Sequence, residues 1–181
     1  MSVLSDYGRY VEDRIDNSLL TNKTYIGVDN LLPNKKGVRP SNYKPTEGKS
    51  IKFKKNDILI GNIRPYFKKI WLATFDGGCS PDVLCIRPND ESYANYLYCV
   101  LSQDAFFEYD MTGVKGSKMP RGDKGHIMNF PVKLIPEYEK KGKLIKEIES
   151  QIMRNDELVQ KLQCFKPASN FSENGGMKYA G

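Results

Sequence analysis

Short apolar runs separated by turn-forming residues occupy the first half of the chain. Apolar segments of this length, rich in Ile, Leu, Val, Tyr and Phe, are typical of β-strands. Clusters of Gly, Pro, Asn and Asp between them indicate turns, including one at residues 76–78. We therefore predict strands over residues 25–28, 51–53, 57–63, 70–75 and 83–86, and a last strand over 131–135.

The pattern changes to a helical period at Ser92. Ser92 has a side chain suited to capping a helix N-terminus, and the apolar residues that follow it recur on one helical face. Pro136 introduces a much longer helical pattern over residues 137–165. At about 1.5 Å per residue, a helix of this length would be about 43 Å long, enough to act as a spacer.

A seam of mostly apolar residues follows one side of this long helix. Its members are separated by 3, 4, 3, 4 and 3 residues, which is the spacing of a two-helix coiled coil. Asn155 lies on the seam, where a polar residue fixes register and orientation at a cost in stability. The polar residues around the seam favour pairing with another helix, and packing on the chain's own domain is the alternative. The seam consists of Ile145, Ile148, Ile152, Asn155, Val159 and Leu162.

Together these elements predict an α+β protein. The short strands are expected to form a compact mixed or barrel-like sheet with accompanying helices, followed by a long C-terminal coiled-coil helix. We expect three parts along the chain: a recognition domain at residues 1–135, a spacer or dimerisation helix at 136–166, and a flexible tail rich in Asn, Ser and Gly at 167–181.

Positive charge is concentrated in one part of the chain. The formal net charge is +6 and the isoelectric point is about 9.0, whereas residues 33–69 alone hold eleven Lys and Arg residues against two acids. Residues 33–48 contain three prolines and two glycines and are expected to form a long basic loop. A concentrated positive field suits a polyanion. The alternative is a stretch of solvated lysines.

A second basic segment spans residues 111–125. Lys115, Lys118, Arg121 and Lys124 come at every third residue among four glycines. Glycine allows the backbone to approach phosphates closely, and the hydroxyl of Ser117 adds a hydrogen-bond donor. A flexible loop without a ligand is the alternative interpretation.

Two side chains at the end of the apolar run 57–63 are suited to reading bases. Arg64 and Asn62 have the geometry for bidentate contacts with guanine and adenine edges, respectively. A structural role for Asn62 in the turn before Pro65 is equally compatible with the sequence. The candidate DNA-binding residues are therefore Lys35, Lys36, Arg39, Lys44, Asn62, Arg64, Lys68, Lys69, Lys115, Ser117, Lys118, Arg121 and Lys124.

The chain has no pattern typical of a catalytic or metal centre, and we expect no bound metal or cofactor. His126 is the only histidine and has no nucleophile motif beside it. A small nuclease centred on Asp82 is the enzymatic alternative. Without a secretory segment or a run of 18 apolar residues, we expect a cytoplasmic protein. Four cysteines are too far apart for a CxxC motif and are expected to be small buried residues: Cys79, Cys85, Cys99 and Cys164.

Several blocks, in this order, resemble the target recognition domains of type I restriction–modification specificity subunits. The resemblance extends over roughly residues 20–163. The blocks are YIGVDNL at 25–31, DILIGNIRPYFKK at 57–69, GGCSPDVL at 77–84, KGSKMPR at 115–121 and IMNFP at 127–131.

This resemblance implies a non-catalytic protein that recognises double-stranded DNA. In that family two recognition domains, each followed by a helix, usually share one chain, and each reads half of an interrupted site. It implies partnership with methyltransferase subunits, which use S-adenosylmethionine to methylate adenine, and with ATP-dependent restriction subunits.

The present sequence has one recognition domain and one helix, so it resembles half of such a subunit. Such a half-subunit is similar to the product of a split or truncated gene. We therefore expect a homodimer or pairing with a different half-subunit. The alternative is a non-catalytic adaptor that binds a methyltransferase without specific DNA binding, and RNA binding is compatible with the charge alone.

Overall fold

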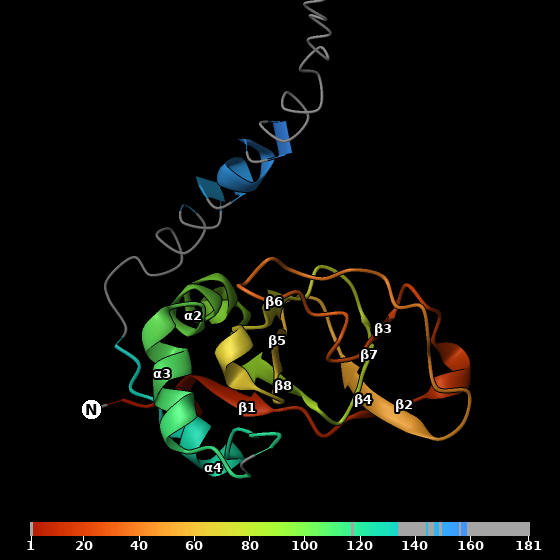
Figure 1. Cartoon of the computed structure of the whole chain (residues 1–181), viewed down its shortest axis with the longest axis horizontal. Coiled ribbons are helices and arrows are strands. Elements are labelled where there is room, and N and C mark those ends of the chain that lie inside the picture. The colour runs from red at the N-terminus through yellow and green to blue at the C-terminus, as the bar shows by residue number, and fades with distance from the viewer. Residues whose placement is uncertain are drawn as a thin grey trace, which may run out of the picture. The chain divides into compact units, whose positions relative to one another are not determined.

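The computed structural model describes residues 2–116, 118–133, 144, 147–148, 150–155 and 157–158. The chain divides into two units, Met1–Lys146 and Glu147–Gly181. The first unit contains the strands and the shorter helices (Figure 1). Within the described residues, no helix is both long enough and apolar enough to cross a membrane.

Four antiparallel strands form the first sheet. Its order is β1 (Gly8–Tyr10), β8 (Val83–Pro88), β5 (Ile58–Gly61) and β6 (Ile70–Leu72). The central strand β5 is apolar throughout, as predicted, because both faces of this sheet are covered and every residue of the strand is buried.

The second sheet is mixed. Its order is β2 (Arg14–Asp16), β4 (Lys49–Phe53), β7 (Gly77–Cys79) and β3 (Tyr25–Ile26), and β3 pairs with β7 in parallel. The expected mixed sheet is thus confirmed. The barrel-like form is wrong, because the strands of the described residues form two open sheets.

Helices cover one side of the first sheet (Figure 1). The predicted cap at Ser92 is wrong, because Ser92 lies inside the short helix η3, where the side chain of Asp90 accepts its backbone N–H, and α2 begins only at Ala94. The described residues of Met1–Lys146 contain α1 (Leu4–Tyr7), η1 (Asn17–Leu19), η2 (Pro65–Phe67), η3 (Glu91–Tyr93), α2 (Ala94–Leu101), α3 (Asp104–Thr112) and α4 (Lys124–Met128).

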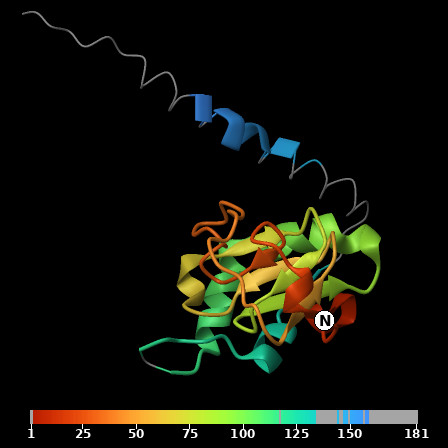
Figure 2. The same ribbon diagram turned by 90° about the vertical axis from the view of Figure 1, so that its right-hand side faces the viewer.

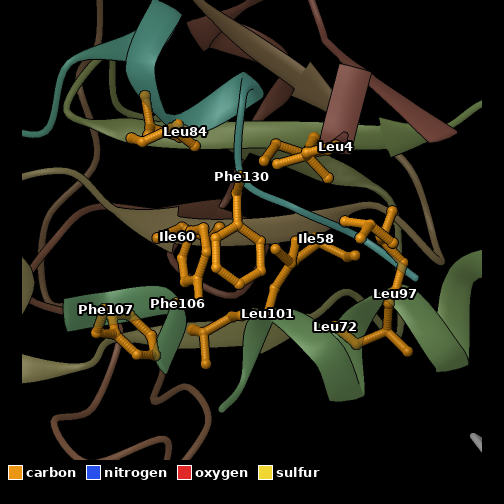
Figure 3. Packing of buried hydrophobic residues seen from close by; sticks show 14 of the residues in the cluster. Leu4, Ile58, Ile60, Leu72, Leu84, Leu97, Leu101, Phe106, Phe107 and Phe130 are labelled. Carbon is orange, nitrogen blue, oxygen red and sulfur yellow. The ribbon is translucent and has the colours of Figure 1, made fainter. Parts of the chain in front are cut away.

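Strand β5 joins two hydrophobic clusters, because successive side chains of a strand point to opposite faces. Ile58 and Ile60 pack with the helices, and Phe106, Leu97 and Phe130 lie in the same cluster (Figure 3). Leu59 points to the other cluster, which also contains Trp71 of β6 and Phe53 of β4 in the second sheet. The first sheet is therefore buried on both faces and gives the loops at its end a rigid base.

The turn predicted at residues 76–78 is wrong, because Gly77 and Gly78 belong to strand β7. These glycines are required by close packing. A Cβ placed on Gly77 would lie 2.2 Å from the carbonyl oxygen of Thr24 and 2.6 Å from Cζ of Phe53. Glycine here admits a neighbouring backbone instead of ending the strand.

The prediction of a last strand at 131–135 is also wrong for residues 131–133, the part of this range that the structure describes. Pro131 forms only an isolated bridge with Val3, and the N–H of Val132 donates to the carbonyl of Ser2 at 3.0 Å. Residues 134–135 lie outside the described residues.

The unit Glu147–Gly181 is helical where it is described. Ile148 and Ile152 of the predicted seam are 47% and 54% exposed, and Asn155 is helical and exposed. The seam residues Ile145, Val159 and Leu162 and the tail at 167–181 lie outside the described residues. The coiled coil and the three-part division of the chain remain predictions.

Candidate nucleic-acid interface

The short helix η2 is held between two residues in the left-handed backbone region. Arg64 has φ 53° and Lys68 has φ 52°. Non-glycine residues adopt this conformation at an energetic cost, and such residues are concentrated at functional sites. The N–H of Arg64 donates to the carbonyl of Pro120 at 2.8 Å, so the start of η2 is fixed to the second basic segment.

The basic loop at residues 33–48 packs against η2 through its backbone. Asn34 and Lys35 also have positive φ values, 55° and 62°. The N–H of Asn34 donates to the carbonyl of Phe67 at 2.8 Å, and that of Lys35 donates to the carbonyl of Lys68 at 2.9 Å. The two strained loops therefore stabilise each other.

The glycine-rich segment forms a narrow loop, which we call the glycine loop, residues 113–122. Lys115 and Arg121 exchange backbone hydrogen bonds of 2.9 Å in both directions, and Gly116 has φ 89°. Lys118 and Met119 are exposed on the loop. Figure 2 shows this loop projecting from the side of the domain that carries η2. Ser117 lies outside the described residues.

These segments surround an open cleft of about 580 Å³. Arg39 of the basic loop, Arg64 at the start of η2 and Met119 of the glycine loop all line it. Tyr43 and Asp82 contribute to the same lining. Residues separated by up to eighty positions in the sequence thus meet at one concave surface.

Acidic residues neutralise four of the predicted cations. Asp104, at the start of α3, binds the Nζ atoms of Lys35 and Lys68 at 2.9 and 3.0 Å. Hydrogen bonds from Lys35 and then Lys68 lower the pKa of the Asp104 carboxyl. The remaining two pairs join Arg121 to Asp82 at 3.2 Å and Lys115 to Asp123.

Four other predicted cations form no ion pair, side-chain hydrogen bond or cation–π contact within the described residues. We call Lys36, Arg39, Arg64 and Lys118 the unpaired cations. All four are exposed. Arg39 and Arg64 line the cleft, and Lys118 is adjacent in sequence to Met119, which also lines it. Exposed, unpaired cations around a concave surface are suited to binding phosphates and base edges.

No family model and no curated protein matches this chain, whereas several solved structures do. A chain from a structural description of the complex assembly and conformational transition of the type I R-M system matches with a TM-score of 0.65 and 22% identity. The HsdS subunit from Thermoanaerobacter tengcongensis matches with a TM-score of 0.64 and 18% identity. Both alignments cover 90% of this chain and 44% of the other.

A third match is the type I restriction–modification S subunit from M. genitalium. Its TM-score is 0.56 at 11% identity, over 88% of this chain and 41% of that chain. The fold is that of a type I specificity-subunit domain. At these identities the likeness concerns the fold, and the chain spans less than half the length of these structures.

Three further predicted cations in this specificity-subunit fold are occupied by contacts within the domain. Lys69 donates to the carbonyl of Val28 at 2.8 Å, and burial lowers its pKa. Lys44 donates to the carbonyl of Asn17 at 3.2 Å. Lys124 lies 5.7 Å from the centre of the Tyr10 ring. The hydrogen bonds of Lys44 and Lys69 hold the loops in place, so we leave these two lysines out of the exposed surface, whereas Lys124 is itself exposed.

Asn62 is buried, whereas none of the other predicted contact residues that the structure describes is. Its backbone N–H donates to the carbonyl of Asp82 at 2.9 Å. A Cβ placed on Gly122 would lie 2.9 Å from its Oδ1 and 2.4 Å from Oδ1 of the fully buried Asp110. Asn62 therefore lies beneath the glycine loop and can reach a base only if that loop moves.

His126 and Asp82, the residues considered for catalysis, both make contacts within the domain. The ring of His126 stacks on Tyr109 at 4.1 Å, and Asp82 is paired with Arg121. The described residues include no group of three or more His, Cys, Asp or Glu that could hold a metal ion. Cys79, Cys85 and Cys99 are buried, as predicted, and Cys164 lies outside the described residues.

Two features of the specificity-subunit fold were not found from the sequence. One is a buried ion pair in which Arg87 donates to both carboxylate oxygens of Asp57, at 2.9 and 2.8 Å. An arginine at the end of an apolar strand was the only sequence signal for it. The other is the exposed aromatic pair of Tyr66 and Phe67 in η2, which hydrophobic patterning assigns to a core.

Proposed function

We propose that this chain is a DNA-recognition component of a type I restriction–modification system. It would direct partner adenine methyltransferase and restriction subunits to one half of a bipartite site. The observation that carries the proposal is the cleft lined by Arg39 and Arg64, both unpaired within the described residues, in a fold shared with specificity subunits.

In this proposal the two arginines read bases and the lysines contact the backbone. Arginine makes bidentate contacts with guanine O6 and N7, whereas lysine contacts phosphates as a point charge. The backbone bond from Arg64 to Pro120 fixes the position from which the side chain extends. Precise placement of this kind is needed for base reading, since a mispositioned donor cannot satisfy both guanine acceptors.

The partner half would be a second copy of this chain or a different half-subunit. The chain spans 44% of the length of the HsdS structure that it matches. The exposed Ile148 and Ile152 of the helical unit would contribute to pairing with the partner's helix.

Selection from a random-sequence duplex library tests this proposal directly. The full chain, alone and co-expressed with a type I methyltransferase subunit, should enrich one sequence, and adenines in that sequence should become methylated in the co-expressed complex. Arg64→Ala should relax discrimination at one base position by about 1–3 kcal/mol. Enrichment of no sequence by either sample, together with capture of the methyltransferase, would establish an adaptor without specific DNA binding.

A further inference from the structure

Two neighbouring aromatic rings are exposed on η2. Tyr66 is 48% exposed and Phe67 is 37% exposed, and their ring centroids are 4.8 Å apart. Neither belongs to the hydrophobic clusters that stabilise the domain. Exposing two adjacent rings forfeits the stability that their burial would provide, so a partner that covers them is the expected reason for their position.

The backbone around these rings is held unusually firmly for a surface turn. Pro65 restricts the first position of η2, and the left-handed Arg64 and Lys68 stand at its two ends. The carbonyls of Phe67 and Lys68 accept hydrogen bonds from the basic loop. The rings are therefore presented on a preorganised turn, which reduces the entropy lost when they are covered by a partner.

Cations flank the aromatic pair along the chain. Arg64 directly precedes η2 and is unpaired, and Nζ of Lys69, which also donates to the carbonyl of Val28, lies 5.9 Å from the centre of the Phe67 ring. Lys36 lies in the loop that is hydrogen-bonded to η2. Apolar rings flanked by cations match the chemistry of a DNA duplex, in which a stack of flat bases lies between two rows of phosphates.

We propose that Tyr66 and Phe67 form an aromatic wedge that enters the duplex at one base step and partly unstacks it. The proposal rests on the proposed function, because it requires this surface to bind duplex DNA. The wedge adds a second source of specificity. Base steps differ in the cost of unstacking, and pyrimidine–purine steps are the most easily deformed, so the wedge would favour sequences that place such a step beneath η2.

Fluorescence of 2-aminopurine tests the wedge, because this base becomes brighter when it is unstacked. The probe is the duplex that the wild-type full chain selects from the random library, with 2-aminopurine replacing each adenine in turn. A donor–acceptor pair at the duplex ends reports bending at steps that lack adenine. The variants are Tyr66→Ser with Phe67→Ser, and the matched controls are Tyr66→Phe, which keeps the ring, and Leu19→Ala, which removes an exposed apolar side chain from η1.

The wild-type chain should brighten the probe at one step and bend the duplex there. The double serine variant should lose both signals and bind about tenfold or more weakly, while both controls keep them. A wild-type chain that binds its selected duplex without brightening or bending it overturns the wedge and leaves the proposed function standing, even if the serine variant does not fold. Retention of both signals by a folded serine variant also overturns it. Selection of no sequence overturns the proposed function and the wedge together.

Discussion

Neutralising the unpaired cations should reduce the salt dependence of DNA binding more than neutralising the same number of paired cations. One variant replaces Lys36, Arg39, Arg64 and Lys118 with Gln. The matched variant replaces Lys35, Lys68, Lys115 and Arg121, which pair with Asp104, Asp123 and Asp82. Both variants lower the formal net charge from +6 to +2, so the long-range attraction to DNA falls by a similar amount in each.

The expected magnitude follows from the number of phosphates that each set can contact. Each neutralised phosphate contributes about 0.9 to the slope of log affinity against log salt. In the proposed function only Lys36 and Lys118 of this set contact phosphates, so losing these two contacts should reduce the slope by up to about 1.8. Between about 50 and 200 mM salt, this makes the loss of affinity about tenfold smaller than in the wild type. The paired variant should change the slope by less than about 1, since its cations already have carboxylate partners.

Fluorescence anisotropy of a labelled duplex over this range of salt measures the slopes, and stopped-flow mixing measures the association rate constants. The association rates of the two variants should fall together, because they report the overall field. Equal changes in the two slopes, or a larger change in the paired variant, would show that ion pairing does not select the phosphate contacts and would refute the reasoning.

The remaining predictions concern the stability of the domain. Arg87→Leu should cost about 3–5 kcal/mol in urea denaturation, because it leaves the carboxylate of Asp57, 2% exposed, without its partner; adding Asp57→Leu should recover part of this loss, and an additive double variant would contradict the pairing. Burial raises the pKa of Asp110 from about 3.8 to about 6. The neutral form of Asp110 therefore stabilises the fold below about pH 4, and this contribution, on the order of 3 kcal/mol, is lost as the pH rises through 6. Asp110→Asn should flatten the fall in unfolding free energy between about pH 4 and 7, and an unchanged profile would exclude this residue as its source. Gly77→Ala should cost at least about 1–3 kcal/mol, because its Cβ would overlap Thr24, whereas Gly125→Ala, with no contact under 3.3 Å, should change the unfolding free energy by less than about 1 kcal/mol.

Strongly apolar segments were predictable because their burial does not depend on which neighbour covers them. The runs around β5, β6 and β8 were located from the sequence, and the structure confirms strands there. The short strands β1 and β2 were missed, since three residues with polar members carry too little periodicity. β7 was missed because glycine is as typical of a turn as of a strand that another backbone approaches closely.

The concentration of positive charge at residues 33–69 was equally clear from the sequence. Which of these cations remain available was not, because their partners come from other parts of the chain. Lys35 and Lys68 are neutralised by Asp104, which lies 69 and 36 positions away. Proximity in space, which the fold determines, decides whether a lysine is paired.

By itself the sequence determined the class of the fold, the apolar strands at its centre and the positive charge available to a polyanion. These depend on composition and on local periodicity, which can be read from the sequence without the tertiary structure. Only the tertiary structure decided that Arg39 and Arg64 meet at one cleft, that Asn62 is covered, and that Tyr66 and Phe67 are exposed. Such outcomes depend on contacts between segments that are distant in the sequence. A contact of this kind stabilises the protein only after folding has brought its two residues together.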